Sequence, residues 1–328
     1  MSKMKYVDCI MFGGYNVILH SDMENCFDVF LQKNYCLCET RSLKNINIYS
    51  VIRRGIVNNV VYKNKKIKHK NFNVYISKVE GGPKGIIIET INNGSICNYM
   101  IVSENANSQL TLLRSVLIKL FFHSYTEIGA YPIHCASVCH KGNSYLFIAD
   151  SNGGKSTVYF SFASYSDPTE YSLMSDDTIL CRAEGDSIVG SVMPLKPSLR
   201  KGTMKYVPPT KCFRNQFELG YNMEDQIYVD IKRLKNFSTV LESKIKAAFF
   251  LNFSDRFDID EVNDIPMLKK KLAIIICGYK ATPVNEQLLE FINKIVNNTR
   301  FYNIYIPENM KDFHKEFVKW VETNEEAR

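Results

Sequence analysis

The sequence predicts an α/β fold in which a mostly-β N-terminal domain precedes an α/β C-terminal domain. Up to about residue 104, short segments rich in Ile, Val, Tyr and Asn alternate with turn signals, a pattern typical of strands. After Gly129, apolar runs of strand length are mixed with segments whose apolar residues recur at three and four positions, as in amphipathic helices. We therefore expect two domains, 1–104 and 105–328.

The N-terminal domain is expected to be a succession of β-strands. Lys5–His20 alternates between apolar and polar residues around Gly13-Gly14, which indicates strands on either side of the glycines. Further strands are expected at Asn47–Tyr62, Asn71–Val79, Gly85–Ile91 and Ile96–Val102. The Asn- and Lys-rich tract Lys63–Lys70 is interpreted as a hairpin tip. Apolar residues on one face of Ser108–Tyr125 predict a connecting amphipathic helix.

The C-terminal domain is expected to contain one sheet whose strands come from distant parts of the sequence. The expected strands are Ile133–Val138, Ser144–Ala149, Tyr171–Ser175, Thr178–Arg182, Ser187–Val192, Ala247–Leu251 and Tyr302–Ile306. One helix should follow the second of these strands. Others are expected at Asp260–Lys271, at Val284–Val296 and from Asn309 to the end.

Composition places the chain among globular cytoplasmic proteins. Its 328 residues are 45% hydrophobic and 12% aromatic, enough for one large core or two modest ones. The ten cysteines show no paired spacing typical of a zinc site, so we expect reduced thiols. The close pairs Cys36/Cys38 and Cys135/Cys139 are interpreted as small buried side chains. The first apolar run, Cys9–Phe12, is too short for a signal peptide, and no run approaches the ~20 residues of a membrane helix.

Positive charge is concentrated in the N-terminal domain. The formal net charge is +7, and Arg41–Val79 holds ten Lys or Arg residues but no Asp or Glu. The stretch Arg53–Lys70 lacks the regularly spaced aromatic residues of nucleic-acid-binding surfaces, so nucleic acid is not an expected partner. We interpret this stretch as a solvated face, with docking of an acidic peptide as the alternative.

One motif carries the chemistry. Ala149–Ser156 matches the pattern [Ala/Gly]-x4-Gly-Lys-[Ser/Thr], with a strand expected before it and a helix after it. In such a loop, backbone N–H groups surround the β-phosphate, Gly153 and Gly154 permit positive φ and close approach, and Lys155 reaches the β- and γ-oxygens. Ser156 then offers a hydroxyl to Mg²⁺. The predicted nucleotide-binding residues are Ser151, Asn152, Gly153, Gly154, Lys155, Ser156 and Thr157.

An aspartate pair and a histidine accompany this motif. Asp176-Asp177 follows an expected strand about twenty residues downstream, where a carboxylate could hold the metal. One aspartate can bind Mg²⁺ while the other accepts the proton of an attacking hydroxyl. His134 opens the strand before the glycine loop and could hydrogen-bond one aspartate, tuning its basicity. The alternatives are an ordinary Asp-Asp turn and a structural histidine.

Three segments in this order, Ile133–Val138, Phe147–Thr157 and Met174–Asp177, resemble the catalytic domain of HPr kinase/phosphorylase and its shorter relatives over residues 130–185. The resemblance implies a PEP-carboxykinase-like P-loop kinase core. It also implies catalytic roles for His134, Lys155 and Asp176, with Ser156 and Asp177 at the metal. By analogy Asp176 is the general base, supported by His134, and Asp177 belongs to the Mg²⁺ shell, although the two aspartates could exchange roles.

Two departures bear on the substrate. Ala149 replaces the first glycine of the loop, and the glycine-arginine-asparagine signature expected near the C-terminus is missing, so HPr itself is not the expected acceptor. Tyr6–Gly13 followed by His20-Ser21-Asp22 resembles the start of HPr-kinase-like proteins of lasso-peptide and other modified-peptide pathways. That resemblance implies a serine of a precursor peptide as the acceptor.

The expected function is an ATP- and Mg²⁺-dependent phosphotransferase that modifies a serine hydroxyl of a peptide or protein. Two alternatives stay open: a regulatory protein that binds a nucleotide without transfer, and a small-molecule kinase acting on free serine or a sugar. The sequence does not decide between ATP and GTP, nor whether the reverse reaction occurs. The resemblance makes a homo-oligomer plausible. A basic loop, Met193–Pro197 with Arg200-Lys201-Gly202, could contact the transferred phosphoryl group or simply be solvated. No role is assigned to Arg182, Arg214 or Arg256.

Overall fold

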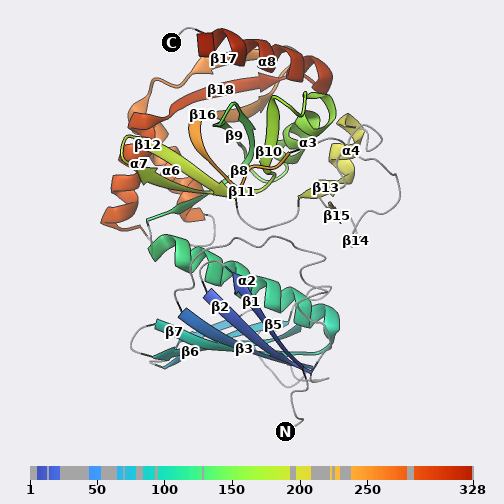
Figure 1. Cartoon of the computed structure of the whole chain (residues 1–328), viewed down its shortest axis with the longest axis vertical. Helices are drawn as coiled ribbons and strands as arrows, with labels where there is room; N and C mark the ends of the chain where they lie inside the picture. The colour runs from blue at the N-terminus through green and yellow to red at the C-terminus, as the bar shows by residue number, and fades with distance from the viewer. Residues whose placement is uncertain are drawn as a thin grey trace. The chain divides into compact units, whose positions relative to one another are not determined.

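The computed structural model describes residues 6–12, 15–22, 44–52, 65–68, 71–78, 84–92, 95–127, 129–192, 197–207, 222–223, 226–229, 238–278 and 284–326. Predictions that concern Gly13-Gly14, Cys36, Cys38, 53–64, 193–196 and Arg214 lie outside these residues. The chain divides into two compact units, Met1–Glu127 and Ile128–Arg328 (Figure 1). The boundary therefore follows residue 127, whereas the sequence suggested one at 104/105.

The first unit is one sheet with a helix on it. Its described strands are β1 (Tyr6–Phe12), β2 (Tyr15–Ser21), β3 (Lys44–Ile52), β4 (Lys65–Lys68), β5 (Phe72–Lys78), β6 (Lys84–Asn92) and β7 (Ser95–Ser103). They are hydrogen-bonded in the order β1-β2-β3-β7-β6-β5-β4. Strand β4 lies in the tract interpreted as a hairpin tip, where it pairs with β5 as an edge strand. The exposed Lys68 suits an edge, because a charged side chain discourages pairing with a further strand.

Helix α2 (Ala106–Glu127) belongs to the first unit, and this explains the shifted boundary. It packs against β7, β3 and β6. Its buried apolar residues are Leu112, Leu113, Val116, Leu117 and Leu120. The side chain of Asn105 accepts a hydrogen bond from the Ser108 N–H at 2.8 Å and so caps the helix start. The amphipathic stripe was predicted correctly, but a sequence pattern does not say which sheet the stripe covers.

The second unit is a mixed α/β structure. Its first half contains β8 (Tyr131–His140), β9 (Asn143–Ile148), α3 (Lys155–Tyr165), β10 (Tyr171–Ser175), β11 (Thr178–Glu184), β12 (Ser187–Val192), β13 (Ser198–Arg200) and α4 (Lys201–Tyr206). Its second half contains β14 (Asn222–Met223), β15 (Gln226–Tyr228), β16 (Glu242–Phe253), β17 (Asp258–Glu261), α6 (Ile265–Gly278), α7 (Glu286–Asn298), β18 (Arg300–Ile306) and α8 (Met310–Glu326).

The main sheet of this unit runs β10-β8-β11-β12-β16-β18-β17, and β9 bonds to both β8 and β16. Strand β16 is parallel to β9 and to β18, whereas the other pairings are antiparallel. A small sheet, β13-β15-β14, completes the described strands. The strand at Tyr302–Ile306 was expected to join the same sheet as the earlier strands, and β18 confirms this.

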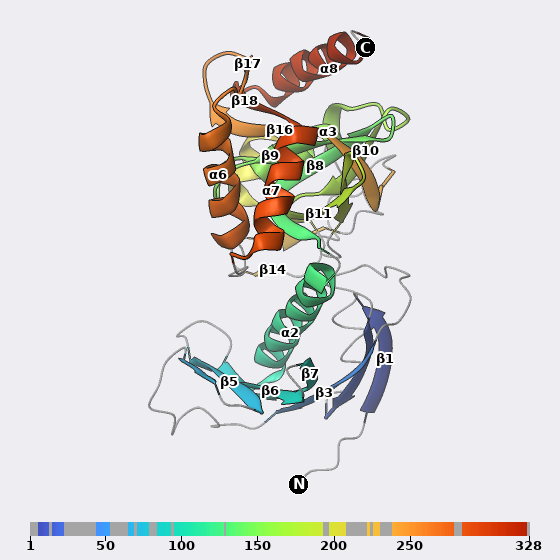
Figure 2. The same cartoon turned by 90° about the vertical axis from the view of Figure 1, so that its left-hand side faces the viewer.

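Helices cover both faces of the main sheet (Figure 2). On one face, α3 and α8 enclose a cluster rich in aromatic side chains, with Phe147, Phe162, Phe249, Phe313 and Phe317 fully buried. On the other face, α6 and α7 cover a mainly aliphatic cluster. Residues of β9, and of β16 from Ala247 onward, alternate between the two clusters, as the two-residue period of a strand requires. The sheet is therefore buried on both sides.

One helix prediction was partly wrong. The expected helix at Asp260–Lys271 is replaced by the end of β17, which pairs with β18, and by α6, which starts only at Ile265. The carboxylate of Asp264 accepts a hydrogen bond from the Met267 N–H at 3.0 Å and caps the helix at this later point. In the described residues, no helix is both long and apolar enough to cross a membrane.

Candidate active site

The loop between β9 and α3 requires its glycines. Gly154 has φ 89° and is the residue directly before α3. Gly153 donates its N–H to the Asp150 carbonyl at 3.0 Å, and a Cβ at Gly153 would lie 2.6 Å from the Cβ of Ala149. Gly154 needs a left-handed backbone, and there is no room for a Cβ at Gly153. Any other residue at either position would therefore strain the loop.

The start of α3 is open to an anion. Gly154 has no side chain, so no side chain caps the first turn. The first N–H groups of a helix have no partner within it, and together with the helix dipole they attract negative charge. The strand–loop–helix arrangement expected from the sequence is therefore present.

Lys155 is buried and held by its own loop. It is 6% exposed, and its ammonium group donates to the carbonyl oxygens of Ala149 at 2.9 Å and Asp150 at 2.8 Å. Burial lowers the pKa of Lys155, while the negative charge of Asp177 acts in the opposite direction. To reach a phosphate, the flexible lysine stem would exchange these carbonyls for phosphate oxygens.

The two aspartates differ sharply in environment. Asp176 is 5% exposed, and its Oδ2 accepts a hydrogen bond from the Ser198 N–H at 2.8 Å. Burial raises the pKa of Asp176 to about 7, and repulsion from Asp177 adds to the rise. The side chain of Asp177 is 42% exposed, and its Oδ2 accepts a hydrogen bond from the Thr178 hydroxyl at 3.2 Å. Asp176 is thus a buried carboxyl group with a raised pKa, whereas the carboxyl group of Asp177 is accessible to solvent.

His134 lies beside Asp177. Its Nε2 is 3.7 Å from Oδ1 of Asp177, because Thr178 on β11 is the direct cross-strand partner of His134 on β8. By analogy with HPr kinase/phosphorylase, His134 was expected to support Asp176. The structure instead places a backbone N–H group, that of Ser198, on Asp176, since this side chain turns into the protein while Asp177 stays at the surface.

Two side chains near the loop were not among the predicted site residues. Arg200, considered only as part of a basic loop, donates a hydrogen bond to the side-chain oxygen of Asn152 at 2.6 Å. Its positive charge acts on Lys155 and on Asp176. Phe253 ends β16 and packs on Gly154, so that a Cβ at Gly154 would lie 2.8 Å from its ring. The parallel pairing of β16 with β9 brings Phe253 here, and nothing in the local sequence indicates it.

The remaining candidate residues are also located. Ser151 and Asn152 are exposed at the loop tip, and Ser156 is half-buried on the first turn of α3. Thr157 is buried, and its hydroxyl hydrogen-bonds that of Thr203 on α4 at 3.4 Å. Arg182, left without a role, pairs with Glu184 and Glu242 and thereby links β11 to β16.

The residues present fit a Mg²⁺–nucleotide complex. Across the described ranges, no group of three or more His, Cys, Asp or Glu side chains could enclose a metal ion. Mg²⁺ in phosphoryl-transfer enzymes needs less from the protein, because one or two carboxylates act with substrate phosphates and water. The surface carboxylate of Asp177 and the hydroxyl of Ser156 are ligands of this kind.

The described residues define a mixed α/β protein in which a glycine loop and a buried lysine accompany an aspartate pair. No family model matches the chain, and no curated protein matches it either. Among solved structures, it is similar to the HPr(Ser) kinase/phosphatase from Coxiella burnetii, with 13% identity and a TM-score of 0.30. The alignment covers 60% of this chain and 98% of that one. Likeness at this TM-score is too weak to assign a fold family or an activity.

Proposed function

We propose that this chain is an ATP- and Mg²⁺-dependent kinase that transfers the γ-phosphoryl group to a serine hydroxyl of a peptide or protein. The observation that carries the proposal is the buried carboxyl group of Asp176, whose pKa of about 7 suits a general base at neutral pH. It adjoins Asp177, whose charge acts on the lysine of the glycine loop. Strongly shifted pKa values cluster at catalytic sites, which favours phosphoryl transfer over nucleotide binding alone.

The loop supplies the donor side of the reaction. The N–H groups of residues 151–157 and the start of α3 would bind the phosphates of ATP or another nucleoside triphosphate. Lys155 would leave the Ala149 and Asp150 carbonyls and neutralise charge on the β- and γ-phosphates. Arg200, already within 2.6 Å of the loop residue Asn152, could add positive charge as the phosphoryl group moves.

The metal side of the site would use Asp177 and Ser156. These two residues would hold Mg²⁺, which would supply positive charge against the negative charge that develops on the phosphates. His134, 3.7 Å from Asp177, would orient that carboxylate, so we propose His134 as a positioning residue for the metal ligand.

The transfer itself needs a base and an acceptor. The serine oxygen forms a bond to the γ-phosphorus while the bond from that phosphorus to the β,γ-bridging oxygen breaks, leaving ADP. The hydroxyl proton passes to the carboxylate of Asp176. The Ser198 N–H fixes one oxygen of that carboxylate, which leaves the other to receive the proton.

We also propose a cellular compartment and an acceptor for this kinase. Cys135, Cys139 and Cys181 are buried free thiols, which suits a reducing compartment such as the cytoplasm. A precursor peptide of a modified-peptide pathway is the proposed acceptor, and a homo-oligomer remains a prediction.

The test is phosphoryl transfer from γ-labelled ATP with Mg²⁺ to peptides that carry either a central serine or alanine. Wild type should label the serine peptides only, and both Lys155→Ala and Asp176→Asn should abolish labelling. Asp176→Asn should still bind ATP, because it leaves the loop intact. Lys311→Gln, an exposed change on α8, is the matched control and should behave as wild type. Tight ATP binding without transfer to any acceptor would instead identify a regulatory nucleotide-binding protein.

A further inference from the structure

A phenylalanine lies exposed beside the glycine loop, and the reaction proposed above gives it no role. Phe253 is the last residue of β16 and is 59% exposed, whereas Phe249 and Phe250 before it are buried. Single exposed apolar side chains are common on protein surfaces, so the exposure of Phe253 alone does not indicate a function. Its position next to the loop does.

The ring of Phe253 touches the loop with its edge. A Cβ at Gly154 would lie 2.8 Å from Cζ at the tip of the ring and 3.6 Å from each Cε. Gly154 therefore meets the outer edge of the ring and covers neither face. No other aromatic ring among the described residues packs on Phe253. Because Gly154 directly precedes α3, the ring lies next to the N–H groups that would bind the phosphates.

The strand order explains why Phe253 reaches the loop. Strands β9, β16 and β18 are parallel neighbours, so their carboxyl ends meet at one edge of the sheet. Ligands of α/β sheets commonly bind outside the carboxyl ends of parallel strands. Ile148 at the end of β9 pairs with Phe250, and β16 continues three residues beyond this pair. Phe253 is thereby brought alongside the loop that follows β9.

The loop has a different neighbour on each side. On one side of β9 lies β8, where Cys135 pairs with Ile148 and its N–H donates to the Asp177 carbonyl at 3.0 Å. His134 and the aspartate pair therefore lie on this side. On the other side of β9 lies β16 with Phe253. The loop thus separates the groups proposed for phosphoryl transfer from an exposed aromatic ring.

This arrangement would give a bound nucleotide a direction. The γ-phosphate has to face Asp176 and Asp177, because the proposed transfer occurs there. The β-phosphate would be bound by the N–H groups of the loop. The α-phosphate, the ribose and the base follow along the same chain of atoms, so they would extend away from the aspartates and toward β16. Phe253 offers a flat apolar surface on that side.

We propose that the ring of Phe253 stacks on the base of the bound nucleotide. The inference rests on the proposed function, because it needs the phosphates in the glycine loop. An aromatic side chain can stack on any nucleobase, and loss of one such contact commonly weakens binding about ten-fold. A phenyl ring carries no polar group that could distinguish adenine from guanine. Phe253 should therefore contribute equally to the binding of ATP and of GTP.

Calorimetry on the full-length protein with Mg²⁺ would compare ATP, GTP and tripolyphosphate, which has three phosphates but no base. Phe253→Leu keeps an apolar side chain but removes the aromatic face. It should weaken the binding of ATP and GTP about ten-fold each and leave the affinity for tripolyphosphate unchanged. Phe253→Tyr keeps the ring and should bind all three ligands as wild type does. Phe72→Leu, the same change at an exposed phenylalanine on β5, is the matched control and should alter none of these affinities.

The outcomes separate base stacking from the kinase reaction. Unchanged ATP affinity in Phe253→Leu would overturn the stacking and leave the kinase proposal standing. An equal loss for ATP and tripolyphosphate would also overturn it, because the ring would then only shape the loop. A wild-type protein that bound ATP through Phe253 but transferred no phosphoryl group would support the stacking and overturn the kinase. Binding of neither ATP nor tripolyphosphate by wild type, shown to be folded by circular dichroism, would overturn both.

Discussion

Burial of Asp176 should make the stability of the second unit depend on pH. The pKa of this carboxyl group rises to about 7 in the folded protein, chiefly because burial disfavours its charge. In the unfolded chain it is about 3.9. Between these values the folded protein keeps a proton that the unfolded chain has released. The free energy of unfolding should therefore fall as pH rises from about 4 to about 7, then level off.

The size of the effect follows from the same pKa values. A difference of about 3 units at 1.36 kcal/mol per unit corresponds to about 4 kcal/mol above pH 7. Asp176 is 5% exposed, so water screens little of this cost. Asp176→Asn has the same shape, stays neutral, and keeps an oxygen for the Ser198 N–H. It should match wild type near pH 4 and be more stable by about 4 kcal/mol at pH 8.

Urea unfolding in EDTA at pH values from 4 to 8 would measure this difference. Fluorescence of Trp320 follows the second unit alone, since the single tryptophan lies there. Asp186→Asn, an exposed aspartate in the turn between β11 and β12, controls for the loss of one formal charge. If wild type and Asp176→Asn gave parallel curves across this pH range, Asp176 would be ionised in the folded state. The general-base assignment would then lose its main support.

Three further predictions concern the loop, the histidine and a helix cap. Gly154→Ala places a Cβ at φ 89° and 2.8 Å from the Phe253 ring. Because a left-handed backbone costs a residue with a Cβ about 1–2 kcal/mol, the affinity for ATP should fall at least about ten-fold in calorimetry. Unchanged affinity would refute the role of the loop in binding ATP. His134→Gln removes the partner of Asp177 and should lower kcat about ten- to a hundred-fold with little change in KM for ATP. A higher KM at unchanged kcat would contradict the positioning role of His134. Asn285→Ala removes the hydrogen-bond acceptor that caps α7 and should lower the free energy of unfolding in urea by about 1 kcal/mol while activity stays unchanged. Loss of activity at unchanged stability would argue against a purely structural cap.

The sequence by itself determined the local elements and the glycine loop. Period-two and helical spacing indicated most strands and helices of both units, because these periods arise from backbone geometry within a few residues. The turn from β9 into α3 was predictable for the same reason, since only glycine tolerates the backbone at Gly154. The aspartate pair was likewise recognisable as a turn that follows a strand.

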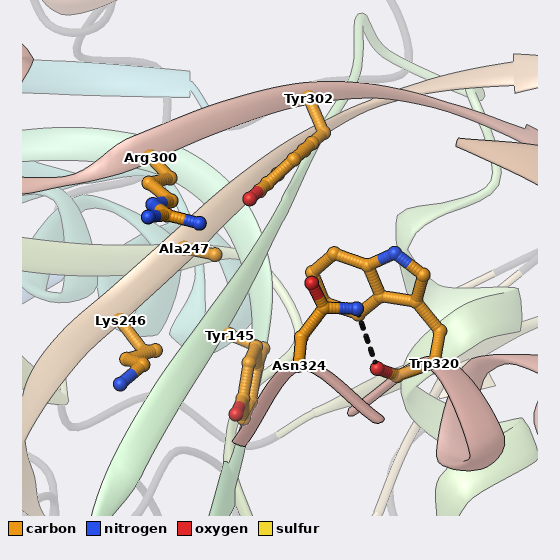
Figure 3. A pocket seen from close by; sticks show the side chains of 7 residues that line it. All are labelled: Tyr145, Lys246, Ala247, Arg300, Tyr302, Trp320 and Asn324. Carbon is orange, nitrogen blue, oxygen red and sulfur yellow. Dashed lines mark hydrogen bonds between the residues drawn. The ribbon is translucent and has the colours of Figure 1, made fainter. Parts of the chain in front are cut away.

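Only the tertiary structure decided how these elements act on one another. Asp258–Glu261 is a strand because β18 lies alongside it, and α2 joins the first unit because that sheet covers its apolar stripe. Asp176 and Asp177 are identical residues side by side, yet one is buried against Ser198 and the other reaches His134. A small crevice lined by Trp320 likewise joins residues from β9, β16, β18 and α8 (Figure 3). Burial and pKa depend on neighbours that are distant in sequence, and local patterns carry no record of them.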